Sequence, residues 1–154
     1  MVAMKEKNVV SMALAAECPT HARTHVKAGA HELVVDEPAA RGGTDRGTTP
    51  TETLLASLLG CTNVILNRVA EHAGVEIERL SLAANAVFDR RGVMLQEEIA
   101  VPFPEITLTI NVTTAASEAA LAKVKADLGR FCPVSKVVRQ SGTKLKEVWN
   151  VSRP

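Results

Sequence analysis

The chain has 154 residues, a formal charge of +1 from 18 basic and 17 acidic side chains, and one Trp and three Phe as its only aromatic residues. A chain of this length buries the core of one domain, so we expect a single domain over residues 1–154. The balanced charge and the few aromatic rings exclude an obvious nucleic-acid surface, which needs a basic patch or base-stacking side chains.

The cysteines are odd in number and far apart, unlike the disulfide framework of a small secreted protein. They are Cys18, Cys61 and Cys132. An apolar run after Lys5 and Lys7 ends at Cys18 and superficially resembles a signal sequence, but Glu17 stands where a small residue is needed. No run reaches the ~18 apolar residues of a membrane span. We therefore expect a cytoplasmic protein with neither a membrane nor a nucleic acid as partner.

The first part of the chain predicts three strands and a loop. Residues 8–16 alternate in the manner of a half-buried strand, and residues 21–38 predict two short strands around a turn at 28–30. The segment 39–49 is rich in Gly and Thr and has no apolar period, so it predicts a loop.

A long helix follows, with a marked start and end. Thr49 is a candidate N-cap, Pro50 suits the first helical position, and Glu52 completes a capping box. The apolar residues of 54–72 cover more than one narrow stripe, so we expect the helix to be buried on most sides. Residues 73–74, Ala-Gly, end it.

The second half of the chain predicts two further strands, two helices and a last strand. The segments are strands 80–89 and 106–114, a helix 117–131 capped by Ser117, a short helix from Cys132 to 140, and a strand 144–152. The order β-β-β-α-β-β-α-α-β is typical of an α+β fold without βαβ repeats. We expect a largely antiparallel sheet wrapped around the long helix.

Two of the cysteines differ in their expected reactivity. Cys132 directly precedes a proline that opens a helix, where free N–H groups and the helix dipole favour a thiolate. Cys61 lies in the body of the long helix, where burial raises the pKa of a thiol and leaves it inert. On its own, Cys61 is better explained as a small core residue.

The segment GGTDRGTTPTETLLASLLGCT, followed about seventy residues later by FCPVSKVV, resembles the OsmC/Ohr superfamily of thiol peroxidases and their OsmC-like relatives. The resemblance extends over nearly the whole chain, because the order of elements also corresponds. It implies an intertwined homodimer in which two sheets wrap the central helices. It also implies an enzyme, an organic hydroperoxide reductase with no cofactor other than its cysteines.

On this resemblance Cys61 is the thiolate that attacks the peroxide, and Cys132 resolves the resulting sulfenic acid as a disulfide. A dithiol reductant, of the lipoyl type in many relatives, then restores both thiols. The family ionises its reactive cysteine with an arginine held by a glutamate. Arg23 is the first candidate for that arginine, and Arg46 is the second.

The glutamate departs from the peroxidase pattern, in which it directly follows the helix-starting proline. Here that position is Thr51 and Glu52 comes one residue later, a shift that resembles the OsmC-like branch. Glu52 is the candidate carboxylate, but nine helical residues place it about 13 Å from Cys61 along the axis and on the opposite face. The capping box explains Glu52 without catalysis. Any carboxylate that reaches Cys61 should come across a dimer interface.

Two functions therefore stay open. The first is a thiol peroxidase that uses Cys61 and Cys132. The alternative is a non-catalytic OsmC-like dimer that binds a small apolar ligand or senses oxidants.

Two histidine arrangements offer a possible metal site and a possible catalytic base. Cys18, His21 and His25 could bind zinc, but the two histidines would lie about 13 Å apart on a strand and no fourth ligand is evident. His72 shares a helix face with Cys61 at a distance of about 16 Å, which is too far for a general base. We predict no metal site.

Overall fold

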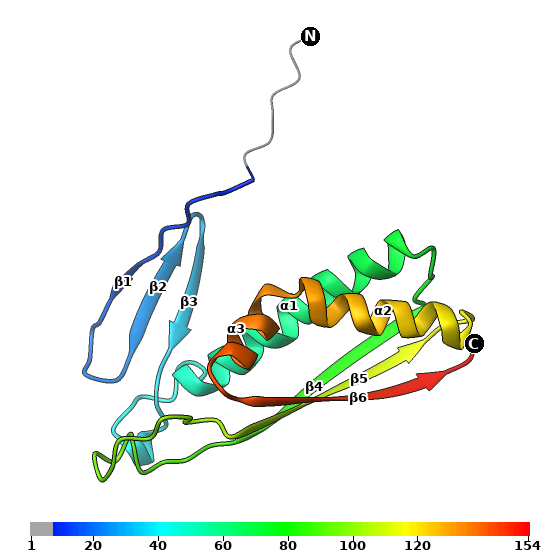
Figure 1. The fold of residues 1–154 in the computed structure, drawn as a ribbon. Coiled ribbons are helices and arrows are strands. Elements are labelled where there is room, and N and C mark those ends of the chain that lie inside the picture. The colour runs from blue at the N-terminus through cyan, green and yellow to red at the C-terminus, as the bar shows by residue number, and fades with distance from the viewer. Residues whose placement is uncertain (1–7) are drawn as a thin grey trace. The chain divides into compact units, whose positions relative to one another are not determined.

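The computed structural model describes residues 8–154, so Lys5 and Lys7 lie outside the described residues. The chain folds as two compact units that divide after Leu54. The order of elements, β-β-β-α-β-β-α-α-β, is the predicted one, with a short 3-10 helix added in the loop before the long helix (Figure 1).

The first unit is built on a three-stranded antiparallel sheet. Strands β1 (Ala15–Glu17), β2 (Thr24–Ala28) and β3 (His31–Val35) pair in the order β1-β2-β3. The β2–β3 turn falls at the predicted place, and Gly29 takes a left-handed backbone with φ 61° there. The 3-10 helix η1 (Ala39–Arg41) interrupts the segment that was predicted to be loop throughout.

The predicted strand over residues 8–16 is wrong for most of its length. Regular pairing starts only at Ala15, and the four large apolar side chains before it are 65–86% exposed. They are Val9, Val10, Met12 and Leu14. Alternation indicates a strand only where one face packs and the backbone finds a partner, and within the described part of this chain residues 8–14 have neither.

Helix α1 (Pro50–His72) begins at the predicted cap and ends before Gly74, which has φ 67°. Its buried residues form one stripe: Leu58, Thr62, Leu66, Val69 and Ala70. The prediction that the helix is buried on most sides is therefore wrong for a single chain, in which Val64 is 48% exposed. Beside the stripe, Leu55, Leu59 and Ile65 are only partly buried against the core.

Helix α1 is also long and apolar enough to cross a membrane by length and composition, with mean hydropathy 1.3 over 18 residues. This corrects the expectation that no run reaches that length. A core helix of a soluble protein passes the same test, so one such helix among residues 8–154 is weak evidence of a membrane span.

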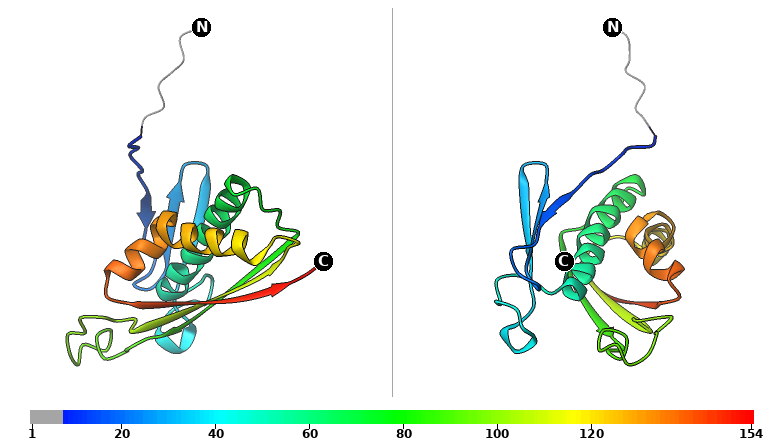
Figure 2. Two further views of the ribbon diagram at one scale, coloured as in Figure 1. Left: turned by 45° about the vertical axis from the view of Figure 1, so that its right-hand side comes forward. Right: turned by 90° about the vertical axis from the view of Figure 1, so that its left-hand side faces the viewer.

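The second unit contains a three-stranded sheet and the remaining helices. Strands β4 (Arg79–Val87), β5 (Glu105–Thr113) and β6 (Lys144–Ser152) pair in that order, antiparallel between β4 and β5 and parallel between β5 and β6. Helices α2 (Glu118–Phe131) and α3 (Pro133–Gln140) form the crossover that the parallel pair requires. Both helices lie over the same side of the sheet (Figures 1 and 2).

The core of this unit lies between the helices and one face of the sheet. Alternate residues of β5 are fully buried, namely Ile106, Leu108, Ile110 and Val112, while the residues between them are polar. Ile106, Leu108 and Ile110 pack with Leu58 and Leu66 of α1, Leu128 of α2 and Leu145 of β6. Cys132 belongs to the same buried cluster, and Cys61 packs against it.

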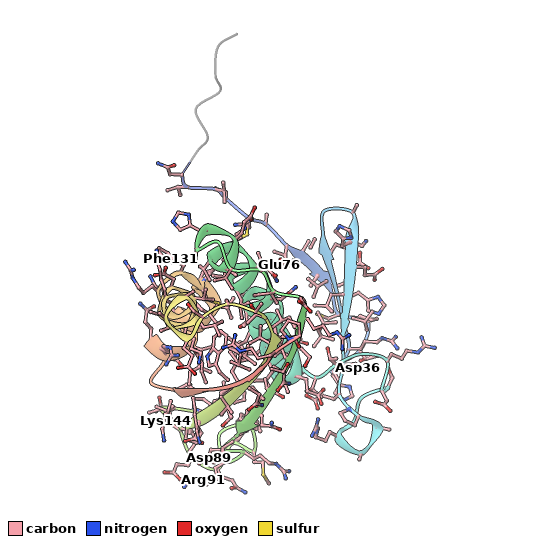
Figure 3. All side chains as sticks on the ribbon, turned by 90° about the vertical axis from the view of Figure 1, so that its right-hand side faces the viewer. Asp36, Glu76, Asp89, Arg91, Phe131 and Lys144 are labelled. Atoms are coloured by element: carbon pink, nitrogen blue, oxygen red, sulfur yellow. The ribbon has the colours of Figure 1, made fainter. Side chains whose placement is uncertain are left out.

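The long connection between β4 and β5 folds on itself. The rings of Phe88 and Phe103 stack with centroids 4.9 Å apart and close its base. Arg91 pairs with Asp89 at 2.7 Å and with Glu97 at 2.6 Å, and Figure 3 shows the first pair at the edge of the unit. The connection is thus an ordered loop closed by an aromatic pair and by ion pairs.

Candidate active site

The Sγ atoms of Cys61 and Cys132 lie 3.4 Å apart, and the Cys132 thiol donates to Cys61. Both are free thiols. Cys132 is fully buried, whereas Cys61 is half-buried and so is the more accessible sulfur. The structure therefore brings together the two cysteines that the sequence separates by 71 positions.

Helix termini fix the position of Cys132. It is the C-cap of α2, where its N–H donates to Leu128 O at 3.0 Å, and also the N-cap of α3. Pro133 occupies the first position of α3, which suits its fixed φ and missing N–H. Cys61 lies in the regular part of α1, where its backbone is held by the helix itself.

The environment within this unit keeps Cys61 protonated. Burial raises the pKa of the Cys61 thiol above its ordinary value, and the hydrogen bond and the charge of the Cys132 sulfur raise it as well. The backbone N–H of Val134 bonds to Cys61 and lowers the pKa, but the net direction is upward. A cation from outside these residues is needed for Cys61 to be a thiolate at neutral pH.

At the start of α3, a free backbone N–H bonds Cys61 rather than Cys132. The sequence predicts that this helix start favours a thiolate at Cys132, which caps it. The first-turn N–H that bonds a sulfur belongs to Val134, and it bonds Cys61. Since the first N–H groups of a helix have no partner within it, this donor is free to stabilise charge on the sulfur.

Arg23 immediately precedes β2 rather than lying in it. Its Nη1 donates to Thr44 Oγ1 at 2.9 Å, and no carboxylate within residues 8–54 pairs with it. Arg46, the second candidate, has an exposed side chain, and its backbone N–H donates to Asp36 Oδ2 at 3.2 Å. Arg23 is thus the better held of the two candidate cations.

Glu52 forms the predicted capping box. Thr49 N donates to Glu52 Oε2 at 2.8 Å, and Glu52 N donates to Thr49 Oγ1 at 3.2 Å. The N–H and then the hydroxyl of Thr49 lower the pKa of the Glu52 carboxyl. Thr51, at the family's glutamate position, has its hydroxyl 3.1 Å from that of Thr49.

His25 and Cys18, two of the candidate zinc ligands, each contact another side chain. His25 Nδ1 lies 2.9 Å from Glu32 Oε1, and Cys18 Sγ lies 3.9 Å from Thr24 Oγ1. Within residues 8–154 no three His, Cys, Asp or Glu side chains cluster closely enough to hold a metal ion. His72 lines a hollow of about 500 Å³ between α1 and α2, where Phe131 is 55% exposed.

The N–H of Val134, which bonds Cys61, escaped the sequence analysis. A backbone donor leaves no mark in the sequence.

A sequence model of a family described as OsmC-like protein matches residues 43–148. Both cysteines and the capping box fall within the match. A search of curated proteins finds no match.

Several solved structures share the fold. An OsmC-like protein from Mycoplasma pneumoniae is 16% identical, with a TM-score of 0.73 over 94% of this chain and 97% of that one. An organic hydroperoxide resistance protein from Elizabethkingia anophelis is 21% identical, with a TM-score of 0.66 over 97% and 100%. The organic hydroperoxide resistance protein OhrB of Bacillus subtilis is 20% identical, with a TM-score of 0.58 over 93% and 98%.

Proposed function

Because the chain belongs to the OsmC-like protein family, we propose that it is a thiol-dependent peroxidase that reduces organic hydroperoxides with Cys61 and Cys132. The observation that carries the proposal is the 3.4 Å separation of the two sulfur atoms. Two structurally similar proteins are described as organic hydroperoxide resistance proteins, which supports the same substrate class.

The half-buried Cys61 is the attacking sulfur in this proposal. Its thiolate attacks the terminal oxygen of R–O–OH, the O–O bond breaks, and the leaving alkoxide takes a proton to become an alcohol. Cys61 then carries a sulfenic acid. The Cys132 thiol, already in contact, attacks that sulfur, so that a disulfide forms and water leaves.

An external dithiol completes the cycle. Its thiolate attacks the disulfide, a mixed disulfide forms, and its second thiol releases both cysteines in the reduced form. The balance is one hydroperoxide and one dithiol converted to one alcohol, one water and one cyclic disulfide. A lipoyl-type dithiol is our candidate reductant, since it closes a stable ring.

Activation of Cys61 is assigned to Arg23. Because burial and the neighbouring thiol raise the pKa of Cys61, the attacking thiolate needs a cation nearby. Arg23 is always charged and makes only one side-chain hydrogen bond within residues 8–54, which leaves donors on its guanidinium for a thiolate. Glu52 is the candidate carboxylate for holding such an arginine, although its position in the cap favours a structural role.

The working unit in this proposal is a homodimer of one OsmC-like domain per chain, residues 1–154, in the cytoplasm. The half-exposed apolar residues of α1 support a dimer, because a helix with apolar residues beyond its buried stripe needs a further partner.

One observation favours a second function. The apolar part of the hollow beside α1 and α2 is formed by Ile65, Val69 and the exposed ring of Phe131, which suits the apolar body of a small molecule. The rest of the lining is Arg68, His72, Asp127 and Arg130. With the pKa of Cys61 raised, a dimer that binds such a ligand, or senses oxidants through slow oxidation, is the alternative to an enzyme.

Stopped-flow reduction of cumene hydroperoxide by the reduced protein separates the two functions. We expect wild type to consume one equivalent per chain rapidly, Cys132→Ser to react once and stop at the sulfenic acid, and Cys61→Ser to be inert. Cys18→Ser is the matched control and should behave as wild type. If wild type and Cys61→Ser consume the peroxide equally slowly, the ligand-binding or sensing function is the one that remains.

A further inference from the structure

Cys61 and Cys132 are a candidate pair of ligands as well as a candidate redox pair. Their sulfur atoms lie 3.4 Å apart, and both are free thiols. Cysteine sulfur is a soft ligand that selects soft metals. Whether the pair can hold such a centre depends on the number of ligands, their distance, their outer contacts and a path of entry.

The number of protein ligands is two. Among residues 8–154 no cluster of three or more His, Cys, Asp or Glu side chains could hold a metal ion, so the pair has no third ligand there. Structural zinc takes four protein ligands, and catalytic zinc takes three. The pair therefore suits a centre that binds two protein sulfurs and brings a substituent of its own.

The distance between the two sulfurs favours a pyramidal centre. With bonds of about 2.3 Å, a tetrahedral angle places two sulfurs about 3.8 Å apart, a right angle about 3.3 Å apart and a linear centre about 4.6 Å apart. The observed 3.4 Å is closest to the right angle. Trivalent arsenic with one organic group is such a centre, because it is pyramidal, with angles near a right angle, and needs only two sulfurs.

The backbone holds both sulfurs in this arrangement. Cys132 joins α2 to α3, and its N–H donates to Leu128 O at 3.0 Å, while Cys61 lies in the regular part of α1. The N–H of Val134 bonds the Cys61 sulfur, an outer contact of the kind that orients a metal ligand. Once one sulfur has bound, the second therefore binds in the same molecule at a high effective concentration.

A path of entry exists on the side of Cys61. Cys61 is half-buried, whereas Cys132 is fully buried. The first arsenic–sulfur bond is therefore expected at Cys61 and the second at Cys132. The organic group of the arsenical then stays on the exposed side of the first sulfur.

We propose that Cys61 and Cys132 form a bidentate binding site for trivalent arsenicals that carry one organic group, R–As(OH)₂. Each thiol gives its proton to one leaving hydroxide, so two As–O bonds break, two As–S bonds form and two waters leave. Arsenic stays trivalent, and no electron is transferred. The site needs neither an activating cation nor a peroxide, so it does not rest on the proposed function.

Phenylarsine oxide is the probe, added to reduced, full-length protein with Cys18→Ser. We expect native mass spectrometry to find one phenylarsenic group per chain. The melting temperature should rise, because the probe bridges a pair that only the folded chain holds together.

Variants with one sulfur of the pair are the comparison. In the same background, Cys61→Ser and Cys132→Ser should bind the probe at least about 100-fold more weakly, because the intramolecular second bond is lost. The matched control is Cys61→Ser/Cys132→Ser with Cys18 retained, which offers one exposed thiol. It should bind no more tightly than the variants that keep one sulfur of the pair.

X-ray absorption at the arsenic edge tests the coordination. We expect two sulfurs and one carbon around arsenic in the Cys18→Ser protein. Zn²⁺, which needs further ligands, should bind more weakly than the probe. An arsenic atom with a single sulfur neighbour, an unchanged melting temperature at saturation, or equally tight binding by a variant that keeps one sulfur overturns the proposal. So does Zn²⁺ binding as tight as that of the probe.

Failure of the proposed function is separate, because these measurements need no turnover. If wild type does not reduce hydroperoxide but both sulfurs hold the probe, the arsenical site stands and the peroxidase does not. If wild type reduces hydroperoxide but does not hold the probe, the reverse is true. Circular dichroism melting without the probe identifies variants that fail to fold. Should Cys132→Ser unfold, Cys61→Ser at the half-buried position decides.

Discussion

Cys61 Sγ accepts a hydrogen bond from the Cys132 thiol and another from the N–H of Val134, two residues further along the chain. A single buried corner, where α2 ends and α3 begins, thus supplies both donors to one sulfur atom. In this contact the Cys132 thiol is the hydrogen-bond donor, and Cys61, which we propose as the attacker, is the acceptor.

The first prediction concerns the product of oxidation. One equivalent of cumene hydroperoxide should convert each chain to a form 2 Da lighter, with a disulfide between Cys61 and Cys132 and with Cys18 still alkylatable. Peptide mapping by mass spectrometry checks this. In Cys132→Ser, dimedone should label Cys61. A dimedone adduct on Cys132 in Cys61→Ser would reverse the assigned roles.

The second prediction concerns the backbone donor. Val134→Pro removes the N–H that bonds Cys61, at a helix position where that group has no partner within the helix. The pKa of Cys61 should rise by about 1, because a hydrogen bond to a charged group is lost. Val134→Ala shortens the side chain but keeps the N–H, so it is the control. Equal values for the two variants, measured by alkylation across pH, would contradict the contact.

The third prediction separates a cap from a catalytic carboxylate. Thr49→Ala should lower the free energy of unfolding by about 1 kcal/mol, since it removes the N-cap oxygen of α1. Glu52→Gln keeps the acceptor that reaches back to Thr49 N, so it should preserve both the melting temperature and the alkylation rate of Cys61. Loss of Cys61 reactivity in Glu52→Gln at unchanged stability would instead show that the charge of Glu52 serves the site.

The fourth prediction concerns Asp36. Burial alone would raise its pKa, but the hydroxyl of Thr44 and the N–H groups of Arg46 and Glu37 donate hydrogen bonds to its carboxylate. These bonds lower the pKa in the folded protein to about 2, below the ordinary 3.8, so the unfolded chain binds the proton more readily. The stability that Asp36 contributes is complete above the ordinary pKa and is lost as the pH falls toward 2. Carboxyl ¹³C NMR should give the value directly, and a pKa near 4 would rule out the described hydrogen bonds. Asp36→Asn should flatten the fall of the urea midpoint over the same pH range.

The fifth prediction tests the packing of the loop. Gly43→Ala should destabilise the protein by at least ~1–3 kcal/mol, because its Cβ would lie within 2 Å of a carbonyl oxygen that belongs to the backbone. Gly129→Ala is the opposite case, a helical glycine with no atom within 4 Å of an added Cβ. It should gain up to about 1 kcal/mol from helix propensity. Thermal melts should show a lower melting temperature for Gly43→Ala than for Gly129→Ala. Equal melting temperatures would contradict the loop geometry.

The sequence predicts local structure well where local signals dominate. The cap at Thr49, the helix end near Gly74, the turn at Gly29 and the last strand, 144–152, all agree with the structure. Each of these depends on neighbours within a few residues. The resemblance to a known family predicted the pairing of the two cysteines, which no periodicity could show.

The predictions that were wrong concern burial and pairing, which depend on residues outside the segment that carries the pattern. Alternation over residues 8–14 could not reveal that no neighbour covers them, and the extra apolar stripes of α1 could not reveal that one chain buries only one stripe. The contact between Val134 N–H and Cys61 depends on a helix start that lies more than seventy residues after Cys61 in the chain. Sequence position alone carries no sign of this contact.

In the proposed cycle, the junction at Cys132 also determines how much of the protein has to rearrange when the disulfide forms. Its N–H donates to Leu128 O, and its carbonyl oxygen accepts from Lys136 N at 3.1 Å and from Ser135 Oγ at 3.1 Å. Cys61 is fixed in the same way by α1. Bringing the sulfurs from 3.4 Å to the roughly 2 Å of a bond is then a matter of side-chain rotation about Cα–Cβ, with both backbones in place. The oxidised and reduced proteins should share one backbone structure, so that a dithiol donor meets a nearly constant surface.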